Sequence, residues 1–157
     1  MSQLSYKPQE WKKWIKRFAE TANSISFHIE ACKNIEYAKE VINICHLCNV
    51  KTGIALKPNT PISEITSLIP LIDYVLVMTV EPGFSGQKFM KSCLLKIIEL
   101  REMYPNLDIQ VDGGINLETF KQCYYSGANI FVSGSYIFRS TNPKKLIQEF
   151  RMIDITI

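Results

Sequence analysis

The chain has 157 residues, a formal net charge of +3 and 46% hydrophobic residues, which fits one globular domain with a hydrophobic core. Its Lys and Arg residues are scattered, which argues against a nucleic-acid-binding protein, and no apolar run approaches the ~18 residues of a membrane span. The start, MSQLSYKPQEW, lacks the apolar region of a signal peptide, so we expect a cytoplasmic protein.

The cysteines are odd in number and irregularly spaced, which predicts free thiols in a reducing compartment. Cys45 and Cys48 form a C-x-x-C pair, but no second pair of Cys or His stands at the spacing of a zinc site. The pair also falls near the end of a predicted helix, whereas redox pairs open one. We interpret both cysteines as packing residues of an amphipathic helix.

In chain order, a helix predicted over residues 7–22 precedes five apolar segments of strand length. The predicted strands are 25–31, 51–58, 74–81, 108–114 and 129–135. Most are apolar nearly throughout, as expected of parallel strands that are covered on both faces.

Helical segments with recognisable caps separate these strands. Residues 34–48 carry apolar side chains close to a 3.6-residue period. Thr60 and Asn142 each precede a proline, which predicts an N-cap followed by proline at the first helical position. Asn116 is a predicted cap for the helix that ends at Gly127.

This alternation of strands and helices predicts a parallel sheet with right-handed crossovers. Two architectures compete: a five-stranded doubly wound sheet, and a (β/α)₈ barrel that would lack about three strands. The last two strands end in DGG (112–114) and SGS (133–135), and barrels usually hold phosphate after strands seven and eight. A third glycine-rich loop, 82–86, follows the preceding strand, so we expect a phosphate-binding rim.

Three ordered motifs together resemble the ribulose-phosphate 3-epimerases, which are (β/α)₈ barrel enzymes. They are VLVMTVEPGFSGQKFM (75–90), IQVDGGIN (109–116) and GANIFVSGSYIFRS (127–140). FHIEA and GIALKPNTP fit the family's fourth and fifth strands, and Ser85 is a small departure from a common glycine. The resemblance implies an α/β fold made of parallel (β/α) units of a TIM barrel, truncated to roughly strands 4–8 with the preceding helix. Residues 1–157 would then be a single, N-terminally incomplete ribulose-phosphate-binding barrel domain.

The resemblance also implies an isomerase of the pentose phosphate pathway that interconverts D-ribulose 5-phosphate and D-xylulose 5-phosphate. The family's chemistry is metal-assisted proton transfer at C3 by two aspartates, with a divalent zinc, iron or manganese ion. Asp112 matches one of these aspartates, as a catalytic residue and metal ligand. The implied substrate and phosphate contacts are Gly83, Phe84, Ser85, Gly86, Asp112, Gly113, Gly114, Gly134, Ser135 and Met78. The expected partner is a small phosphorylated sugar, and a homo-oligomer is left open.

Three of the four metal ligands that the resemblance implies, and the second aspartate, have no match in this sequence. His28 falls on the apparent fourth strand and His46 on a helix that would face away from the rim, so we interpret both as structural or exposed. We therefore expect slow turnover or none from this chain. The alternative is a non-catalytic phosphate-binding or chain-pairing remnant of the barrel. A hexulose-phosphate synthase is disfavoured, because MTVEPGFSGQKF fits it poorly.

Overall fold

The computed structural model describes residues 8–83 and 86–153, and its centre is one sheet of five parallel strands. The strands are β1 (Ser24–His28), β2 (Lys51–Leu56), β3 (Tyr74–Met78), β4 (Asp108–Asp112) and β5 (Ile130–Val132). Each strand pairs with the next one in sequence, in the order β1-β2-β3-β4-β5. A doubly wound sheet reverses its strand order part-way. The continuous order therefore decides for the barrel type of α/β fold.

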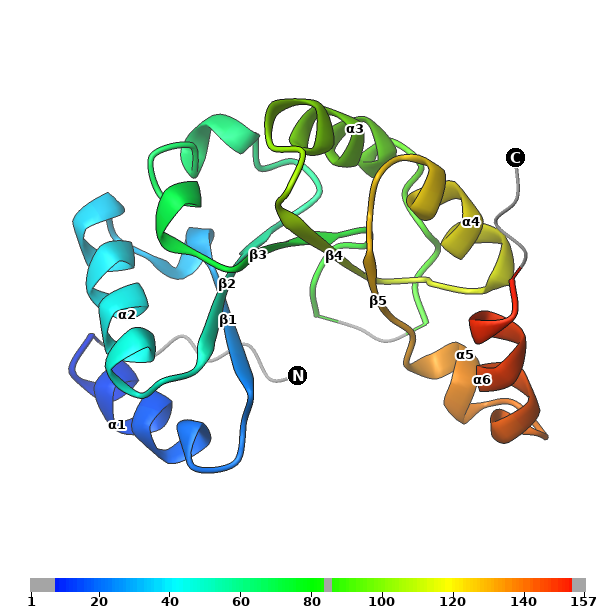
Figure 1. The fold of residues 1–157 in the computed structure, drawn as a ribbon, viewed down its shortest axis with the longest axis horizontal. Helices are drawn as coiled ribbons and strands as arrows, with labels where there is room; N and C mark the ends of the chain where they lie inside the picture. Colours follow the sequence, from blue (N-terminus) through cyan, green and yellow to red (C-terminus); the bar gives the residue numbers. More distant parts are fainter. Residues whose placement is uncertain (1–7, 84–85, 154–157) are drawn as a thin grey trace.

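Helices cover the outer side of this curved sheet (Figure 1). The helices are α1 (Pro8–Ala19), α2 (Ile35–Leu47), α3 (Cys93–Met103), α4 (Leu117–Tyr125), α5 (Ser135–Phe138) and α6 (Pro143–Arg151), of which α5 and α6 lie beyond the end of β5. Short 3₁₀ turns add η1 (Ile29–Ala31), η2 (Ile62–Glu64) and η3 (Ile69–Leu71). Figure 1 shows the sheet as an arc, with α2, α3 and α4 on its outer side.

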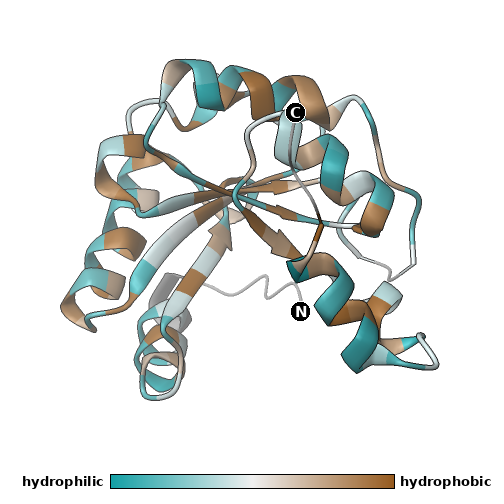
Figure 2. Ribbon diagram, turned by 45° about the vertical axis from the view of Figure 1, so that its right-hand side comes forward, coloured by the Kyte–Doolittle hydropathy of each residue, from teal (hydrophilic) through white to brown (hydrophobic). Residues whose placement is uncertain are grey.

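The core forms where the strands meet these helices. Strand residues that alternate along the outer face, such as Ile54, Val77 and Val111, are completely buried and belong to the main hydrophobic cluster. Figure 2 shows hydrophobic residues along the strands, whereas hydrophobic and hydrophilic residues alternate along the helices. Alternate residues on the other face form a separate small cluster, which consists of Ala55, Tyr74, Leu76 and Met78.

Gly53 makes room for this inner cluster. A Cβ atom at Gly53 would collide with the ring of Tyr74, because this ring lies over the glycine on the neighbouring strand. Glycine in a strand interior weakens pairing unless another group needs the space. Here the tyrosine ring needs it.

The predicted caps are confirmed except one. Asn116 forms a complete capping box with Thr119, and the side chain of Asn142 accepts a hydrogen bond from the Lys145 N–H at 3.0 Å. Thr60 is not an N-cap. The 3₁₀ turn η2 begins after Pro61, and the hydroxyl of Thr60 instead donates to the carboxylate of Glu30.

Side chains also secure the loops at the amino ends of the strands. The carboxylate of Asp73 accepts from the Thr52 N–H at 2.7 Å, and the amide oxygen of Asn129 accepts from the Ile109 N–H at 2.7 Å. The guanidinium of Arg101 donates to four carbonyls, those of Gly127, Pro105 and Leu107 at 2.7 to 3.0 Å and that of Tyr104 at 3.4 Å. This edge of the sheet is therefore held by hydrogen bonds between side chains and the backbone.

The two cysteines of the C-x-x-C pair pack against the rest of the protein, as the sequence predicted. Cys45 is buried in the core and Cys48 is half-buried at the end of α2, which is the packing role predicted for the C-x-x-C pair. Burial raises the pKa of the Cys45 thiol. Among residues 8–83 and 86–153, no helix has the length and apolar character needed to cross a membrane.

Candidate functional site

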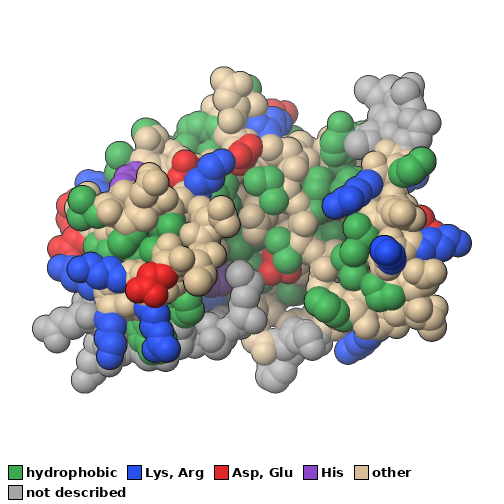
Figure 3. Space-filling view, turned by 60° about the horizontal axis from the view of Figure 1, so that its bottom comes forward, with side chains coloured by type: hydrophobic (Ala, Val, Ile, Leu, Met, Phe, Trp, Pro, Cys, Tyr) green, Lys and Arg blue, Asp and Glu red, His purple; other side chains and the backbone are tan. Residues whose placement is uncertain are grey.

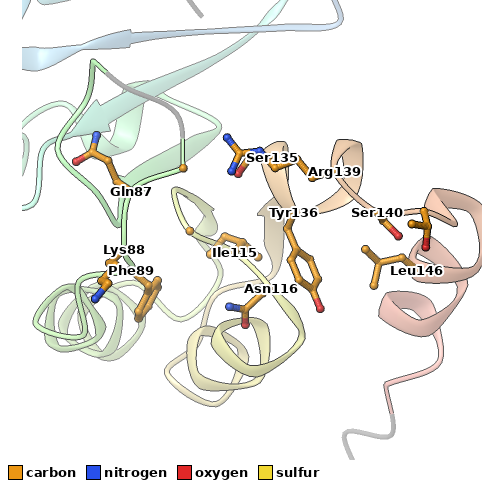
Figure 4. Close-up of a pocket in the computed structure, with 13 residues that line it drawn as sticks. Gln87, Lys88, Phe89, Ile115, Asn116, Ser135, Tyr136, Arg139, Ser140 and Leu146 are labelled. Carbon is orange, nitrogen blue, oxygen red and sulfur yellow. The ribbon is translucent and has the colours of Figure 1, made fainter.

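The loops that follow β3, β4 and β5 border one cavity of about 720 Å³ (Figure 4). Its lining consists of Gly86, Gln87, Lys88, Phe89, Gly114, Ile115, Asn116, Ser135, Tyr136, Arg139, Ser140, Thr141 and Leu146. Three of the predicted contact residues, Gly86, Gly114 and Ser135, are in this set, one from each loop. The carboxyl ends of three neighbouring parallel strands meet at one edge of the sheet, which is why loops far apart in sequence lie together.

Asp112 is the last residue of β4, half-buried and two residues before Gly114. In the sheet it lies opposite Met78 on β3 and Val132 on β5. Burial raises the pKa of its carboxyl group above the ordinary value. Acidic and hydrophobic side chains occupy the hollow on the open side of the arc in Figure 3. Asp112 is not part of the cavity lining, but Gly114, two residues later in the sequence, is.

Gly113 and Gly114 are required by the packing of the chain itself. Both have positive φ, at 124° and 65°. A Cβ atom at Gly113 would lie 2.6 Å from Cγ2 of Val80, and one at Gly114 would lie 2.9 Å from the backbone nitrogen of Phe89. The two glycines therefore let the loop after β4 lie directly against the loop after β3.

Thr79 is a site residue that the sequence did not reveal. It is completely buried, and its hydroxyl oxygen lies 2.5 Å from the carbonyl oxygen of Gly113 and 3.1 Å from that of Asp112. Its backbone N–H also donates to the Asp112 carbonyl at 2.9 Å. Thr79 thus fixes the backbone that carries the Asp112 carboxylate. A threonine that follows an apolar strand gives no signal of this role.

The other predicted contact residues lie apart from the cavity lining. Gly83 and Gly134 both have open space where a Cβ atom would stand, so their backbones are accessible. Met78 lies on the inner face beside Asp112 and is 9% exposed. Phe84 and Ser85 are outside the described residues.

The two histidines are not grouped with Asp112. His28 ends β1, separated from β4 by two strands, and its Nδ1 lies 3.2 Å from a carboxylate oxygen of Glu30. His46 is exposed on α2 and lines a smaller cavity of about 330 Å³ with residues at the amino ends of the strands. Both positions match the structural or exposed role that the sequence predicted.

Glu30 joins the ends of β1 and β2 at the rim. Its carboxylate accepts from the Lys57 N–H at 2.9 Å and from the hydroxyl of Thr60. Burial alone would raise its pKa, but hydrogen bonds from His28, Thr60 and Lys57 outweigh burial and lower the pKa to about 2. The ammonium of Lys96 also donates to the Lys57 carbonyl at 2.7 Å. The loop after β2 is therefore held by two charged side chains.

Metal donors are sparse at this edge. Within residues 8–83 and 86–153, no three His, Cys, Asp or Glu side chains stand close enough together to hold a metal ion. Of the residues that the resemblance assigned to a metal, the described structure contains Asp112 alone. These residues do not fit a complete metal centre by themselves.

Comparisons with known proteins agree with the motifs. A sequence profile described as the Ribulose-phosphate 3 epimerase family matches residues 8–138. A ribulose-phosphate 3-epimerase from Eremothecium gossypii is 42% identical over 139 residues, which are 88% of this chain and 57% of that protein. A second, from Bacillus subtilis, is 39% identical over 149 residues, 91% of this chain and 67% of that protein. A third, named a cytoplasmic isoform, from Oryza sativa subsp. japonica, is 40% identical over 133 residues, 83% of this chain and 58% of that protein.

The chain thus spans 57% to 67% of the length of these three curated relatives. Among solved structures, a mutant tryptophan synthase alpha-subunit from Pyrococcus furiosus superimposes with a TM-score of 0.62 at 17% identity. That match covers 87% of this chain and 56% of the other. At this identity it supports the TIM-barrel type of fold and nothing further. The family match covers most of the chain and agrees with the order of the strands and the motifs at their ends. The chain is a member of the ribulose-phosphate 3-epimerase family.

Proposed function

We propose that this chain carries one side of the proton-transfer site of an epimerase that interconverts D-ribulose 5-phosphate and D-xylulose 5-phosphate, a reaction of the pentose phosphate pathway. The observation that carries the proposal is the position of Asp112. This half-buried carboxylate ends β4, two residues before Gly114, which lines the cavity bordered by the three loops. The relatives that share these motifs are named for this reaction.

The chemistry requires a base near C3 of the sugar, next to the C2 ketone. A carboxyl group whose pKa is raised by burial is a stronger base, and so a better proton acceptor, than an ordinary aspartate. Asp112 would remove or return the C3 proton on one face of the planar enediolate. Inversion at C3 also needs a second acid–base group on the opposite face, which the described residues do not assign.

The resemblance also implies a divalent ion, and Asp112 is the residue proposed to contribute a ligand to it. Because the described residues do not form a metal site, the proposal gives the ion no part in the proton transfer. Phosphate and hydroxyl groups of the sugar would contact the loops, and Met78 would lie against the reacting carbons. The residues proposed for these loop contacts are Gly83, Phe84, Ser85, Gly86, Gly113, Gly114, Gly134 and Ser135.

We also propose a domain organisation, a localisation and an oligomeric state for the protein. Residues 1–157 would belong to a single ribulose-phosphate-binding barrel domain that acts in the cytoplasm, where the free cysteines of the described chain stay reduced. A homo-oligomer is the arrangement to test first, by light scattering on the purified chain.

Proton exchange tests the proposal directly, because a one-sided site can exchange a proton without inverting the carbon. D-Ribulose 5-phosphate incubated with the chain in D₂O should lose its C3 proton signal by NMR, with little or no D-xylulose 5-phosphate formed. Asp112→Asn should slow this exchange by about 10²-fold or more. The matched control is Asp108→Asn, at the other end of the same strand, which should retain the exchange.

Equal exchange in the wild-type chain and Asp112→Asn would overturn the proposal. Phosphate binding without any exchange would instead favour the non-catalytic alternative.

The stability of the chain gives a second test of Asp112. Its raised pKa means that the folded state disfavours the charged carboxylate, so this contribution to stability is present below the ordinary value and lost as pH rises. Asp112→Asn should therefore have a higher urea midpoint than the wild type at pH 7 and the same midpoint at pH 3.

A further inference from the structure

The cavity at the carboxyl edge has an uneven charge. Its lining contains two cationic side chains, Lys88 and Arg139, and no Asp or Glu. The remaining polar lining is neutral and consists of amide and hydroxyl side chains. Cationic groups without nearby carboxylates produce a positive potential in a concave surface, which attracts anions. The lining as described thus favours an anionic ligand.

Arg139 stands where it can contact such a ligand. It follows α5, and its guanidinium reaches across to the loop after β3 (Figure 4). The position of a Cβ atom at Gly86 is 3.4 Å from Nη2 and 3.6 Å from Nη1 of Arg139. Figure 4 shows the end of the Arg139 side chain beside Ser135. The guanidinium therefore lies between two of the three loops that line the cavity.

The donors of Arg139 are not used within the described protein. Across residues 8–83 and 86–153, its side chain takes part in none of the ion pairs or hydrogen bonds. Arg101 is the contrast within the same chain, because its guanidinium donates to four backbone carbonyls. An arginine that serves the fold resembles Arg101. Arg139 keeps a planar fork of N–H donors that have no acceptor among the described residues, beside Gly86 in the loop after β3.

Lys88 differs from Arg139 in direction. In Figure 4 its ammonium points away from Arg139 and from the middle of the cavity. It contributes to the general potential but is not placed to contact the same group. Arg139 is therefore placed to contact a bound anion directly, whereas Lys88 contributes only to the surrounding potential.

We propose that Arg139 binds the phosphate group of the sugar phosphate and makes the site selective for phosphorylated over unphosphorylated sugars. The guanidinium fork matches two phosphate oxygens, which a lysine cannot match in the same way. The identity of the sugar rests on the proposed function, whereas the phosphate contact does not. Arg139 is thus a binding residue that the family motifs did not indicate.

Titration with inorganic phosphate tests the contact without any need for catalysis. The dissociation constant is measured by ³¹P NMR for the wild-type chain and for Arg139→Gln, at low ionic strength. We expect binding about tenfold weaker in Arg139→Gln, the effect of losing one charged hydrogen-bonding partner at an accessible site. Arg139→Lys should recover part of the affinity, because it restores the charge but not the fork. D-Ribulose 5-phosphate should show the same order of affinities.

Two control variants separate the contact from the general field. Arg151→Gln removes the same charge from the last turn of α6, outside the cavity, and should leave phosphate binding unchanged. Lys88→Gln should weaken binding less than Arg139→Gln does. Circular dichroism and the urea midpoint check that each variant is folded.

The proposal is overturned if the wild-type chain does not bind phosphate, if Arg139→Gln binds it as the wild type does, or if all three charge-removing variants weaken binding equally. These outcomes are independent of proton exchange at C3. Loss of phosphate binding in Arg139→Gln, in a chain that exchanges no proton, would support this inference while the proposed function fails. Proton exchange that depends on Asp112, with unchanged phosphate binding in Arg139→Gln, would do the opposite.

Discussion

The hydroxyl of Thr79 offers the sharpest test of how the site is held. Replacing Thr79 with valine keeps the β-branched shape and removes only the hydroxyl. The carbonyl of Gly113 then loses a donor at 2.5 Å, whereas the carbonyl of Asp112 keeps the backbone N–H of residue 79 at 2.9 Å. One part-buried carbonyl is therefore left without its side-chain donor.

The expected cost follows from that count. An unsatisfied buried acceptor costs roughly 1–3 kcal/mol. The surviving N–H bond and the extra methyl group of valine favour the lower part of that range, about 1–2 kcal/mol. For a chain of this length the cost corresponds to a fall in Tm of about 2–8 °C.

Urea denaturation followed by circular dichroism measures this change. Thr79→Val should lower the midpoint by about 0.5–1 M without a change in the slope. Thr66→Val is the matched control, because the Thr66 hydroxyl donates to the Ile62 carbonyl at 3.3 Å from an exposed position. It should cost less than about 0.5 kcal/mol. Equal midpoints for wild type and Thr79→Val would refute the view that this hydroxyl fixes the loop.

Two further predictions concern the same edge of the sheet. Gly113→Ala should destabilise the chain by about 2–4 kcal/mol, because residue 113 has a positive φ and the new Cβ atom would lie 2.6 Å from Val80. Gly134→Ala, where the Cβ atom meets open space, should cost much less. Similar urea midpoints for the two variants would contradict this prediction. Glu30→Gln should cost about 1–2 kcal/mol at pH 7, a value reduced for the partial solvent exposure of Glu30. The folded pKa of Glu30 is about 2, below its ordinary 4.5, so its contribution to stability is present above pH 4.5 and is lost as pH falls towards 2. A difference in urea midpoint between wild type and Glu30→Gln that stays constant over this range would count against this role of Glu30.

The sequence predicted the strands well because apolar runs bounded by turn residues have few other structures available. All five are observed, with their predicted carboxyl ends two to three residues too long. The first prediction, 25–31, included η1, where Glu30 turns back to bind the loop after β2. That contact joins residues 27 positions apart, and no local pattern encodes it. The same contact explains why Thr60 does not cap a helix.

The site was predicted where backbone conformation decides it, and missed where side chains cross between loops. Gly86 and Gly114 were recognisable, because loops that need positive φ favour glycine. The roles of Thr79 and Arg139 depend on the approach of a neighbouring loop. The short helix α5, which places Arg139, was not predicted, since four residues carry too little periodicity to be seen.

The polar contacts at the amino ends of the strands have a consequence for variation of the protein. The scaffold is held at the amino ends of the strands, the edge of the sheet opposite the cavity, by hydrogen bonds of Asp73, Asn129 and Arg101. Substitutions at the cavity can therefore alter ligand preference while the scaffold remains anchored from below. Engineering for a new ligand should leave those three side chains untouched and concentrate diversity at the other ends of the strands.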